Sequence, residues 1–262
     1  MEENEIRKYV RERYAGIARK GGSCCDPNSP CCGGATPESA SGKVGYSEEE
    51  MRSVPEGSNL GLGCGNPVAL ASLRKGETVL DLGAGGGFDC FLAAREVGPA
   101  GRVIGVDMTP EMVEKARANA RKHGYGNVEF RLGEIEHLPA GDASVDAVVS
   151  NCVVNLSTDK EAVFSEVHRV LKPGGRVMIS DIVLAGKLPD DVAKSLSAYA
   201  GCIAGAIGMD DYVRLLKAAG FADVRVVREE RYDAGVCGQG DLADAVRSVS
   251  FFAVKPPGPA AG

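Results

Sequence analysis

The sequence contains no apolar run that approaches the ~20 residues of a membrane-spanning helix. It also lacks an excess of positive charge, because acidic residues outnumber basic ones and the formal net charge is −6. A negatively charged chain is a poor match for nucleic acid or an anionic membrane as its main partner. The first residues, MEENEIRKYVRERY, are charged and typical of a helix, and no secretory signal is visible in them. We therefore expect a cytoplasmic protein with no nucleic-acid and no membrane partner.

Histidine is scarce, and none of the three (His123, His137 and His168) lies in a motif that indicates chemistry. No internal repeat is visible. The chain does have 262 residues, a hydrophobic fraction of 44% and a charged fraction of 25%. These values are typical of a globular protein with one sizeable core.

Cysteine, by contrast, is plentiful, with nine residues. In a reducing compartment cysteines more often bind metals or do redox chemistry than form disulfides, and an odd number fits a disulfide scaffold poorly. Two adjacent pairs, Cys24-Cys25 and Cys31-Cys32, lie in a segment rich in Gly, Ser and Pro. The pairs lack the CxxC spacing of zinc modules. Capture of a soft ion, thiol exchange, or a mobile and partly oxidised segment all remain open for them.

The central motif is VLDLGAGGG, from Val79 to Gly87, which predicts a strand, a glycine turn and a helix over residues 88–95. A dinucleotide fingerprint GxGxxG would need glycine where Phe88 stands. The carboxylate of Asp81, two residues before Gly83, suits a cationic cofactor better. An ordinary strand–helix turn is the alternative to a binding site.

A second strand, residues 102–107, ends in Asp107, twenty residues after Gly87. Nucleoside-binding α/β folds place the carboxylate that accepts the ribose hydroxyls at this point. Further strands and helices alternate along the chain, which indicates parallel βαβ units. We expect a helix over residues 1–20, strands at 128–132, within 144–154 and 171–183, helical structure from 186 to 220, and closing strands at 222–228 and 247–254.

The combination of VLDLGAGGG, VIGVD, GEIE and LKPGG resembles the class I S-adenosylmethionine-dependent methyltransferase superfamily over roughly residues 60–255. This resemblance implies an α/β protein with a Rossmann-like, doubly wound sheet of seven strands. A cysteine-rich N-terminal segment would precede it, and a helical insertion would precede the last two strands. We divide the chain accordingly into residues 1–57 (N-terminal helix and cysteine-rich segment), 58–185 (cofactor-binding domain) and 186–262 (completion of the sheet and of the substrate-binding site).

Three further stretches, NLGLGCGNP, SNCVVNL and YAGCIAGA, resemble the cysteine-bearing motifs of arsenite methyltransferases. The resemblance implies that Cys64, Cys152 and Cys202 bind the substrate and form its metalloid site. Trivalent arsenic is a soft ion, and soft ions select cysteine ligands. The cofactor-binding residues implied by the same resemblance are Asp81, Gly83, Gly85, Gly87, Asp107, Met108, Glu134, Ile135 and Asn151.

The activity implied is transfer of methyl groups from S-adenosylmethionine to thiol-bound trivalent arsenic (arsenite and methylarsenite) for arsenic detoxification. A thiol reductant, thioredoxin or glutathione, would restore reduced arsenic or cysteines. Two alternatives are a small-molecule O-, N- or C-methyltransferase and a metalloid-buffering protein, and neither accounts for all the motifs. Among the other cysteines, Cys90 has apolar neighbours and is expected in the core, whereas exposure or a redox role is open for Cys237.

Overall fold

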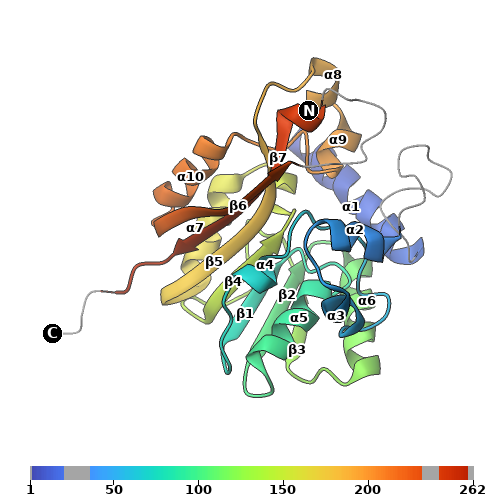
Figure 1. Cartoon of the computed structure of the whole chain (residues 1–262), viewed down its shortest axis with the longest axis vertical. Coiled ribbons are helices and arrows are strands. Elements are labelled where there is room, and N and C mark those ends of the chain that lie inside the picture. Colours follow the sequence, from blue (N-terminus) through green and yellow to red (C-terminus); the bar gives the residue numbers. More distant parts are fainter. Residues whose placement is uncertain (1, 21–35, 232–241, 259–262) are drawn as a thin grey trace.

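A computed structural model describes residues 2–20, 36–231 and 242–258 and contains one seven-stranded sheet (Figure 1). The strand order is β3-β2-β1-β4-β5-β7-β6. Strands β1 to β5 pair in parallel, whereas β7 runs antiparallel to both β5 and β6. This is the doubly wound arrangement predicted from the sequence. The strands are β1 (Thr78–Leu82), β2 (Arg102–Asp107), β3 (Val128–Leu132), β4 (Val145–Asn151), β5 (Leu171–Leu184), β6 (Ala222–Arg231) and β7 (Val246–Val254).

Helices cover both faces of the sheet. In β1, Leu80 and Leu82 pack toward the core shared with α7 (Lys160–Val170) and α10 (Met209–Ala218). Val79, on the opposite face, packs toward α4 (Pro67–Leu70), α5 (Phe88–Val97) and α6 (Pro110–His123). Because a central parallel strand is buried on both faces, it reads as a continuous apolar run interrupted only by Asp81.

The N-terminal helix α1 (Glu3–Lys20) lies over the main domain, in contact with α6 and with α9 (Leu196–Ala200). Ile6 and Val10 form the apolar stripe of α1 and pack against Tyr199 and Ala200. An amphipathic helix over the first twenty residues is thus confirmed. Two short helices, α2 (Pro37–Lys43) and α3 (Glu48–Arg52), follow before α4.

The predicted helical stretch from 186 to 220 is divided into three helices, and this part of the prediction was too simple. Helices α8 (Asp190–Ala193), α9 and α10 are separated by turns, and residues 201–208 are not helical. The chain leaves the helix after Ala200 because Cys202 has a left-handed backbone, with φ of 64°. Gly205 then packs so closely that a Cβ atom there would lie 2.1 Å from the carbonyl oxygen of Asn155.

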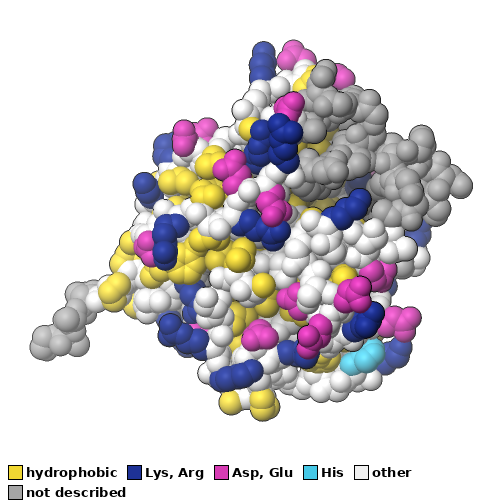
Figure 2. Space-filling view, in the orientation of Figure 1, with side chains coloured by type: hydrophobic (Ala, Val, Ile, Leu, Met, Phe, Trp, Pro, Cys, Tyr) yellow, Lys and Arg dark blue, Asp and Glu magenta, His cyan; other side chains and the backbone are white. Residues whose placement is uncertain are grey.

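One edge of the sheet is β6, whose Val226 and Val227 side chains are exposed. Figure 2 shows hydrophobic side chains over β6 and its neighbour β7, interspersed with Lys and Arg. No helix in the described part of the chain is both long and apolar enough to span a bilayer. The two N-terminal cysteine pairs and Cys237 lie outside the described residues.

Candidate active site

A cleft of about 1100 Å³, including its part open to solvent, lies at the carboxyl ends of the parallel strands. In doubly wound sheets this end is the ligand-binding edge. Gly87 is the one predicted cofactor residue that does not line the cleft. The predicted residues that do line it are Asp81, Gly83, Gly85, Asp107, Met108, Glu134, Ile135 and Asn151.

The glycine turn shapes the floor of the cleft. Gly83, Gly85 and Gly87 all have positive φ, a conformation that residues with a Cβ atom rarely adopt. The backbone N–H of Gly85 donates to Asp107 Oδ2 at 3.0 Å, which joins the turn to the end of β2. Gly87 instead begins α5, and a Cβ atom there would collide with Phe91 and Phe130. Glycine is therefore required at position 87 by the positive φ and by the close packing of Phe91 and Phe130.

Asp107 is oriented by two backbone donors. Besides Gly85, the N–H of Thr109 donates to Asp107 Oδ1 at 2.8 Å. Each carboxylate oxygen has a second lone pair, so both can still accept a hydrogen bond from a ligand. This arrangement suits the two neighbouring hydroxyls of a ribose.

The cleft is acidic, and its acids are held in a poorly hydrated environment. Burial, followed by the charge of Asp89, raises the pKa of Asp81 well above its ordinary value. Burial raises the pKa of Asp89 to about 6, although hydrogen bonds from Tyr46 and Asn151 oppose this shift. Burial also raises the pKa of Asp107. A bound cation would favour the ionised form of each acid, so the cleft fits a ligand with positive charge.

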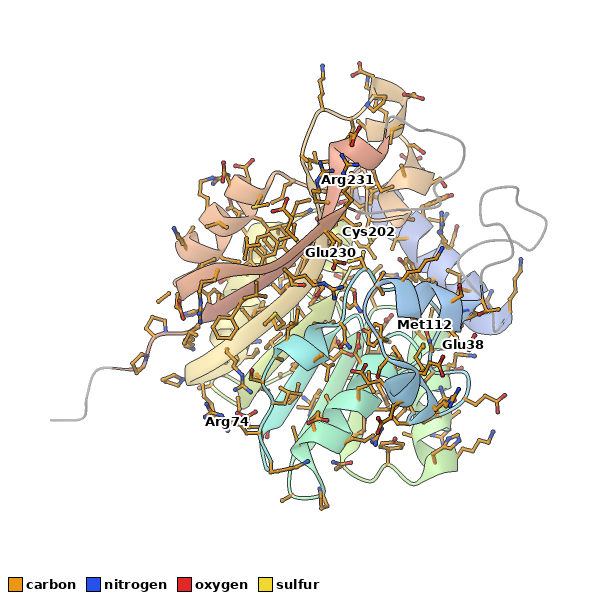
Figure 3. The ribbon with its side chains drawn as sticks, viewed as in Figure 1. Glu38, Arg74, Met112, Cys202, Glu230 and Arg231 are labelled. Carbon is orange, nitrogen blue, oxygen red and sulfur yellow. The ribbon has the colours of Figure 1, made fainter. Side chains whose placement is uncertain are left out.

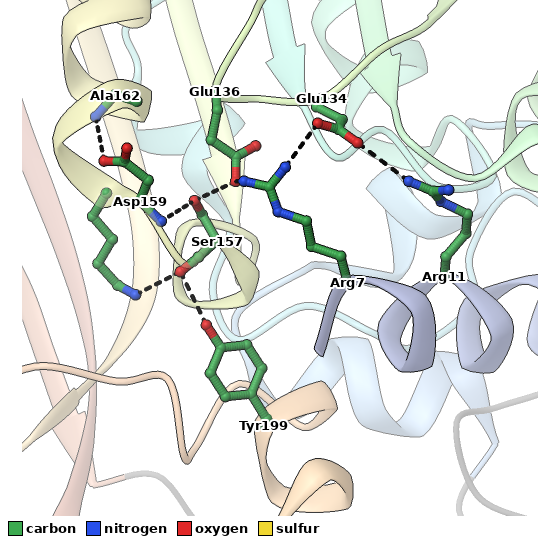
Figure 4. A network of polar contacts seen from close by, with 9 residues as sticks. Arg7, Arg11, Glu134, Glu136, Ser157, Asp159, Ala162 and Tyr199 are labelled. Carbon is green, nitrogen blue, oxygen red and sulfur yellow. Dashed lines mark hydrogen bonds and ion pairs between the residues drawn. The ribbon is translucent and has the colours of Figure 1, made fainter. Parts of the chain in front are cut away.

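Helix α1 closes one side of this cleft. Arg7, Val10 and Tyr14 line it, and the Arg7 guanidinium lies 3.1 Å from Glu134 Oε2. Figure 4 shows that Arg7 and Arg11 both reach Glu134 from α1. The same figure shows Glu136 accepting from Ser157, whose carbonyl oxygen accepts from Tyr199 of α9. The loop that carries the predicted cofactor residues Glu134 and Ile135 is thus tied to both α1 and α9.

The three predicted arsenic ligands converge beside the cleft. Cys64, Cys152 and Cys202 belong to one buried apolar cluster. The sulfur atoms of Cys64 and Cys152 lie within 4.8 Å of each other, and the Cys202 thiol donates to the carbonyl oxygen of Cys152 at 2.8 Å. Figure 3 labels Cys202 near the end of the sheet at which α9 lies. Of the three cysteines, Cys152 alone lines the cofactor cleft. It therefore joins the cleft to the thiol cluster.

Two of these cysteines have a strained backbone. The φ angles are 60° at Cys152 and 64° at Cys202, in the left-handed region that non-glycine residues seldom occupy. Such a conformation costs on the order of 1–3 kcal/mol per residue, and it persists only where surrounding contacts impose it. The concentration of strain at two convergent thiols supports a functional role for this cluster.

All three thiols are protonated in the ordinary pH range. Burial raises the pKa of Cys64. Contact with Cys202 lowers the pKa of Cys152, but contact with Cys64 and burial outweigh it, so the pKa of Cys152 is well above its ordinary value. Contact with Cys152 and burial raise the pKa of Cys202 in the same direction. The site therefore favours a ligand that leaves the cluster without net charge.

Asp181 was not among the predicted site residues; it lies within β5, three residues before the end of that strand, beside the thiols. One carboxylate oxygen of Asp181 and the sulfur atoms of Cys64 and Cys152 all lie within 4.8 Å of one another. Burial raises the pKa of Asp181 to about 7. Its side chain accepts from Asn155, Ile182 and Tyr212, so its oxygens are occupied by protein donors. Its position as a charged residue in the carboxyl-terminal part of β5, which pairs with β4, was the available signal.

Tyr46 and Asp89 were missed as well. The hydroxyl of Tyr46 donates to Asp89 Oδ1 at 2.5 Å and accepts from Asn151 Nδ2 at 2.7 Å. Both residues line the cleft. Nothing in the sequence near Tyr46 indicates this contact, because its partners are 43 and 105 residues away.

Comparison with known proteins identifies the family. Residues 73–220 match the family model of a methyltransferase domain. An arsenite methyltransferase of Halobacterium salinarum is 50% identical over 262 residues, an alignment that covers 96% of this chain and 67% of that protein. The chain belongs to the arsenite methyltransferase family. Its fold and its S-adenosylmethionine-dependent methyltransferase domain are those of this family, as the sequence motifs predicted.

Two other members support the same assignment. The mouse arsenite methyltransferase is 34% identical over 236 residues, which are 86% of this chain and 60% of the mouse protein. The crystal structure of an arsenic(III) S-adenosylmethionine methyltransferase from Chlamydomonas reinhardtii superposes with a TM-score of 0.65 at 37% identity, covering 84% of this chain and 74% of that one. The chain thus spans about 60% to 67% of the length of the two arsenite methyltransferases compared by sequence. The activity of whole family members is therefore a proposal for this chain.

Proposed function

We propose that this protein transfers methyl groups from S-adenosylmethionine to trivalent arsenic held by Cys64, Cys152 and Cys202. The observation that carries the proposal is the position of Cys152, which lines the cofactor cleft, has its sulfur within 4.8 Å of the Cys64 sulfur, and accepts from the Cys202 thiol at its carbonyl oxygen. A metalloid bound to Cys152 would therefore lie beside the cofactor. A generic small-molecule methyltransferase has no need for this junction.

The residues of the cleft fit S-adenosylmethionine, which supplies an activated methyl group when bound. Asp107 would accept the ribose hydroxyls, and Glu134, Ile135 and Met108 would surround the adenine. The glycine turn and the buried carboxylate of Asp81 would hold the amino-acid end with its positive charge. Each of these roles agrees with the lining of the cleft and with its acidity.

Loading of arsenite fits the protonation of the thiols. Arsenous acid, As(OH)₃, is neutral at pH 7, and each of its hydroxyl groups leaves as water with the proton of one thiol. Three As–O bonds break and three As–S bonds form, with no change in net charge. A buried apolar cluster disfavours net charge, so this neutral exchange suits it.

Transfer of the methyl group requires no general base in this site. Trivalent arsenic bound to three sulfur atoms keeps a lone pair, which attacks the methyl carbon without loss of a proton. Because the thiols fix arsenic beside the cleft, the displacement becomes effectively unimolecular. Alkylation oxidises arsenic formally by two electrons, and a thiol reductant such as thioredoxin or glutathione would return those electrons. The absence of histidine from the described cleft lining agrees with this chemistry.

The role that we propose for this activity is detoxification of arsenic in the cytoplasm. We also propose that the chain has three parts, with boundaries after residues 57 and 185. In this scheme the N-terminal cysteine pairs would capture arsenic or relay thiols.

The direct test is to incubate the purified protein with S-adenosylmethionine, arsenite and a thiol, and then to separate the arsenic species. We expect methylated arsenicals to form in proportion to S-adenosylhomocysteine. If the protein binds S-adenosylmethionine and arsenite but produces no methylated arsenical, the proposal is wrong and a buffering role takes its place.

A further inference from the structure

Two asparagines flank Cys152 in the segment Asn151–Asn155, and each one holds the backbone of a different remote cysteine. Asn151 precedes Cys152 by one residue, and its Oδ1 accepts from the backbone N–H of Cys64 at 2.9 Å. Its Nδ2 donates to the carbonyl oxygen of Gly65 at 2.8 Å. The amide of Asn151 therefore clamps the chain on both sides of the Cys64 side chain.

Asn155, three residues after Cys152, makes the corresponding contacts with the third cysteine. Its side chain is completely buried, and Nδ2 donates to the carbonyl oxygen of Ile182 at 2.6 Å and to Asp181 Oδ1 at 2.9 Å. The carbonyl oxygen of Cys202 lies 3.3 Å from the same nitrogen. Asn155 thus connects the turn that carries Cys202 to the end of β5.

We propose that Asn151 and Asn155 are positioning residues that place Cys64 and Cys202 around Cys152 so that all three sulfur atoms bind one arsenic. This inference rests on the proposed function. Neither asparagine touches the metalloid. Each acts through the backbone of a cysteine, and the five-residue segment supplies one ligand itself and orients the other two.

The segments that carry the other two cysteines need such support because neither belongs to the sheet. Cys64 lies in the irregular chain before α4, and Cys202 lies in the turn after α9. A Cβ atom on Gly63 would lie 2.5 Å from Asn151 Nδ2, so the chain before Cys64 packs directly on this amide. The left-handed backbone of Cys202 likewise needs external contacts to hold it.

The sequence motif suggests a different role for Asn151, direct binding of the cofactor. Its amide does line the cleft, but its two N–H groups already have three protein acceptors within hydrogen-bonding distance. These acceptors are the Tyr46 hydroxyl, the Gly65 carbonyl and Asp89 Oδ2. The occupied donors favour the positioning role.

The experiment counts sulfur atoms around arsenic by X-ray absorption at the arsenic edge, in the full chain and in its Asn151→Ala and Asn155→Ala variants. We expect three sulfur neighbours in the parent and two in each variant. Arsenite affinity should fall by about tenfold, as for outer partners of metal ligands. Cofactor affinity of Asn155→Ala, measured by calorimetry, should stay within about twofold of the parent, because Asn155 does not line the cofactor cleft.

Asn127→Ala is the matched control. The Asn127 amide also holds loop carbonyls, those of Gly98 and Gly101 at 3.1 and 3.4 Å, but it lies before β3 at the opposite end of the sheet. This variant should keep three sulfur neighbours. Asn155→Ser, which retains one donor, replaces Asn155→Ala if the alanine variant does not fold.

Double variants separate positioning from general support of the fold. Asn155→Ala should weaken arsenite binding no further in a Cys202→Ser background, because the thiol that it positions is already gone. It should still weaken binding in a Cys64→Ser background. Likewise, Asn151→Ala should weaken arsenite binding no further in a Cys64→Ser background, but it should still weaken binding in a Cys202→Ser background.

If the parent itself binds arsenic through fewer than three sulfur atoms, the proposed arsenic site is wrong whatever the asparagines do. If the parent has three and both asparagine variants keep three, the positioning role is overturned. Loss of cofactor affinity in Asn151→Ala with three sulfur atoms retained would assign Asn151 to the cofactor instead.

Discussion

The Sγ atom of Cys202 lies 2.8 Å from the carbonyl oxygen of Cys152. The thiol of one proposed ligand therefore donates to the backbone of the other, across 50 residues of sequence. Replacement of the thiol proton by arsenic would remove this hydrogen bond and direct the sulfur to the metalloid. In the free protein this contact gives the buried Cys202 thiol a hydrogen-bond acceptor and keeps its sulfur next to Cys152.

The first prediction concerns these two residues. Cys152→Ser, and separately Cys202→Ser, should lower the rate of arsenite methylation by about 100-fold or more, which corresponds to ~2.7 kcal/mol. Serine is close in size to cysteine, but its hydroxyl is a hard ligand that does not replace a thiolate toward a soft ion. Affinity for S-adenosylmethionine and thermal unfolding should change little, and calorimetry and a melting curve check both.

Cys90→Ser is the control for this prediction. Cys90 is also buried, but its thiol donates to Asp81 at 3.1 Å, and the serine hydroxyl can replace that donor. Arsenite should bind to this variant with the stoichiometry of the parent. If Cys152→Ser and Cys202→Ser both methylate arsenite at near the parent rate, the arsenic site is not built from these thiols.

A second prediction tests the cofactor site through Asp107→Ala. The carboxylate is expected to accept two ribose hydroxyls, and hydrogen bonds to a charged group contribute about 1.5–3 kcal/mol each. Affinity for S-adenosylmethionine should therefore fall by about 100-fold or more, while arsenite binding stays close to that of the parent. Calorimetric titration with each ligand measures the two affinities. Equal loss of both affinities would indicate damage to the fold rather than to the ribose site.

The elements that sequence patterns predicted well are those whose structure is set locally. The strands at residues 102–107 and 128–132 have the predicted bounds. An apolar run defines the first and alternation of apolar and charged residues defines the second, each between turn residues. The acid after β2 and the glycine turn also lie where their spacing placed them. The Cys202 segment was predicted as part of the helical stretch 186–220, but its left-handed backbone is imposed by tertiary contacts that no local pattern encodes.

The residues missed at the site are those whose roles depend on distant partners. Asp181 is buried beside two thiols that are 117 and 29 positions earlier in the sequence, and Asn155 reaches Cys202 across 47 residues. Asn155 was nevertheless inside the segment SNCVVNL, which the resemblance had already singled out for Cys152. Asn155 could have been noticed because it is a polar residue shortly after β4, at the carboxyl edge of the parallel sheet where ligands bind.

A third prediction concerns α1 as a wall of the cofactor cleft. Val10 is 1% exposed and lines the cleft, so Val10→Asp would place an unpaired carboxylate in an apolar contact. We expect α1 to separate from the main domain and cofactor affinity to fall by about tenfold, or ~1.4 kcal/mol. Limited proteolysis within residues 3–20 and calorimetry measure the two effects.

Glu12→Ala is the control on the exposed side of α1, where Glu12 pairs with Lys8 at 3.9 Å. An exposed pair of this kind contributes little, so neither proteolysis nor cofactor affinity should change. Unchanged cofactor affinity in Val10→Asp, with α1 released, would mean that the helix does not contribute to binding.

The last prediction is a pH dependence of cofactor binding that passes through Asp89. Its pKa is about 6 because burial opposes its charge, and the nearby Glu50 adds to that shift. Below pH 6 Asp89 is protonated and the cleft loses one negative charge, so a cationic cofactor should bind more weakly, by up to about tenfold per pH unit. Affinity should rise with pH and level off above pH 7, and Asp89→Asn should remove this part of the dependence, leaving only what Asp81 and Asp107 contribute.

Tyr46→Phe gives the sharper form of this test, because the Tyr46 hydroxyl donates to Asp89 and lowers its pKa. Without that donor the pKa of Asp89 should rise, and the midpoint of the affinity curve should move to higher pH. Tyr125→Phe is the control, since its hydroxyl lies 3.5 Å from the Ser53 carbonyl and lines no part of the cleft. Isothermal titrations between pH 5 and pH 8 measure both midpoints. A midpoint that stays in place in Tyr46→Phe, or moves to lower pH, would show that this hydrogen bond does not set the charge of Asp89.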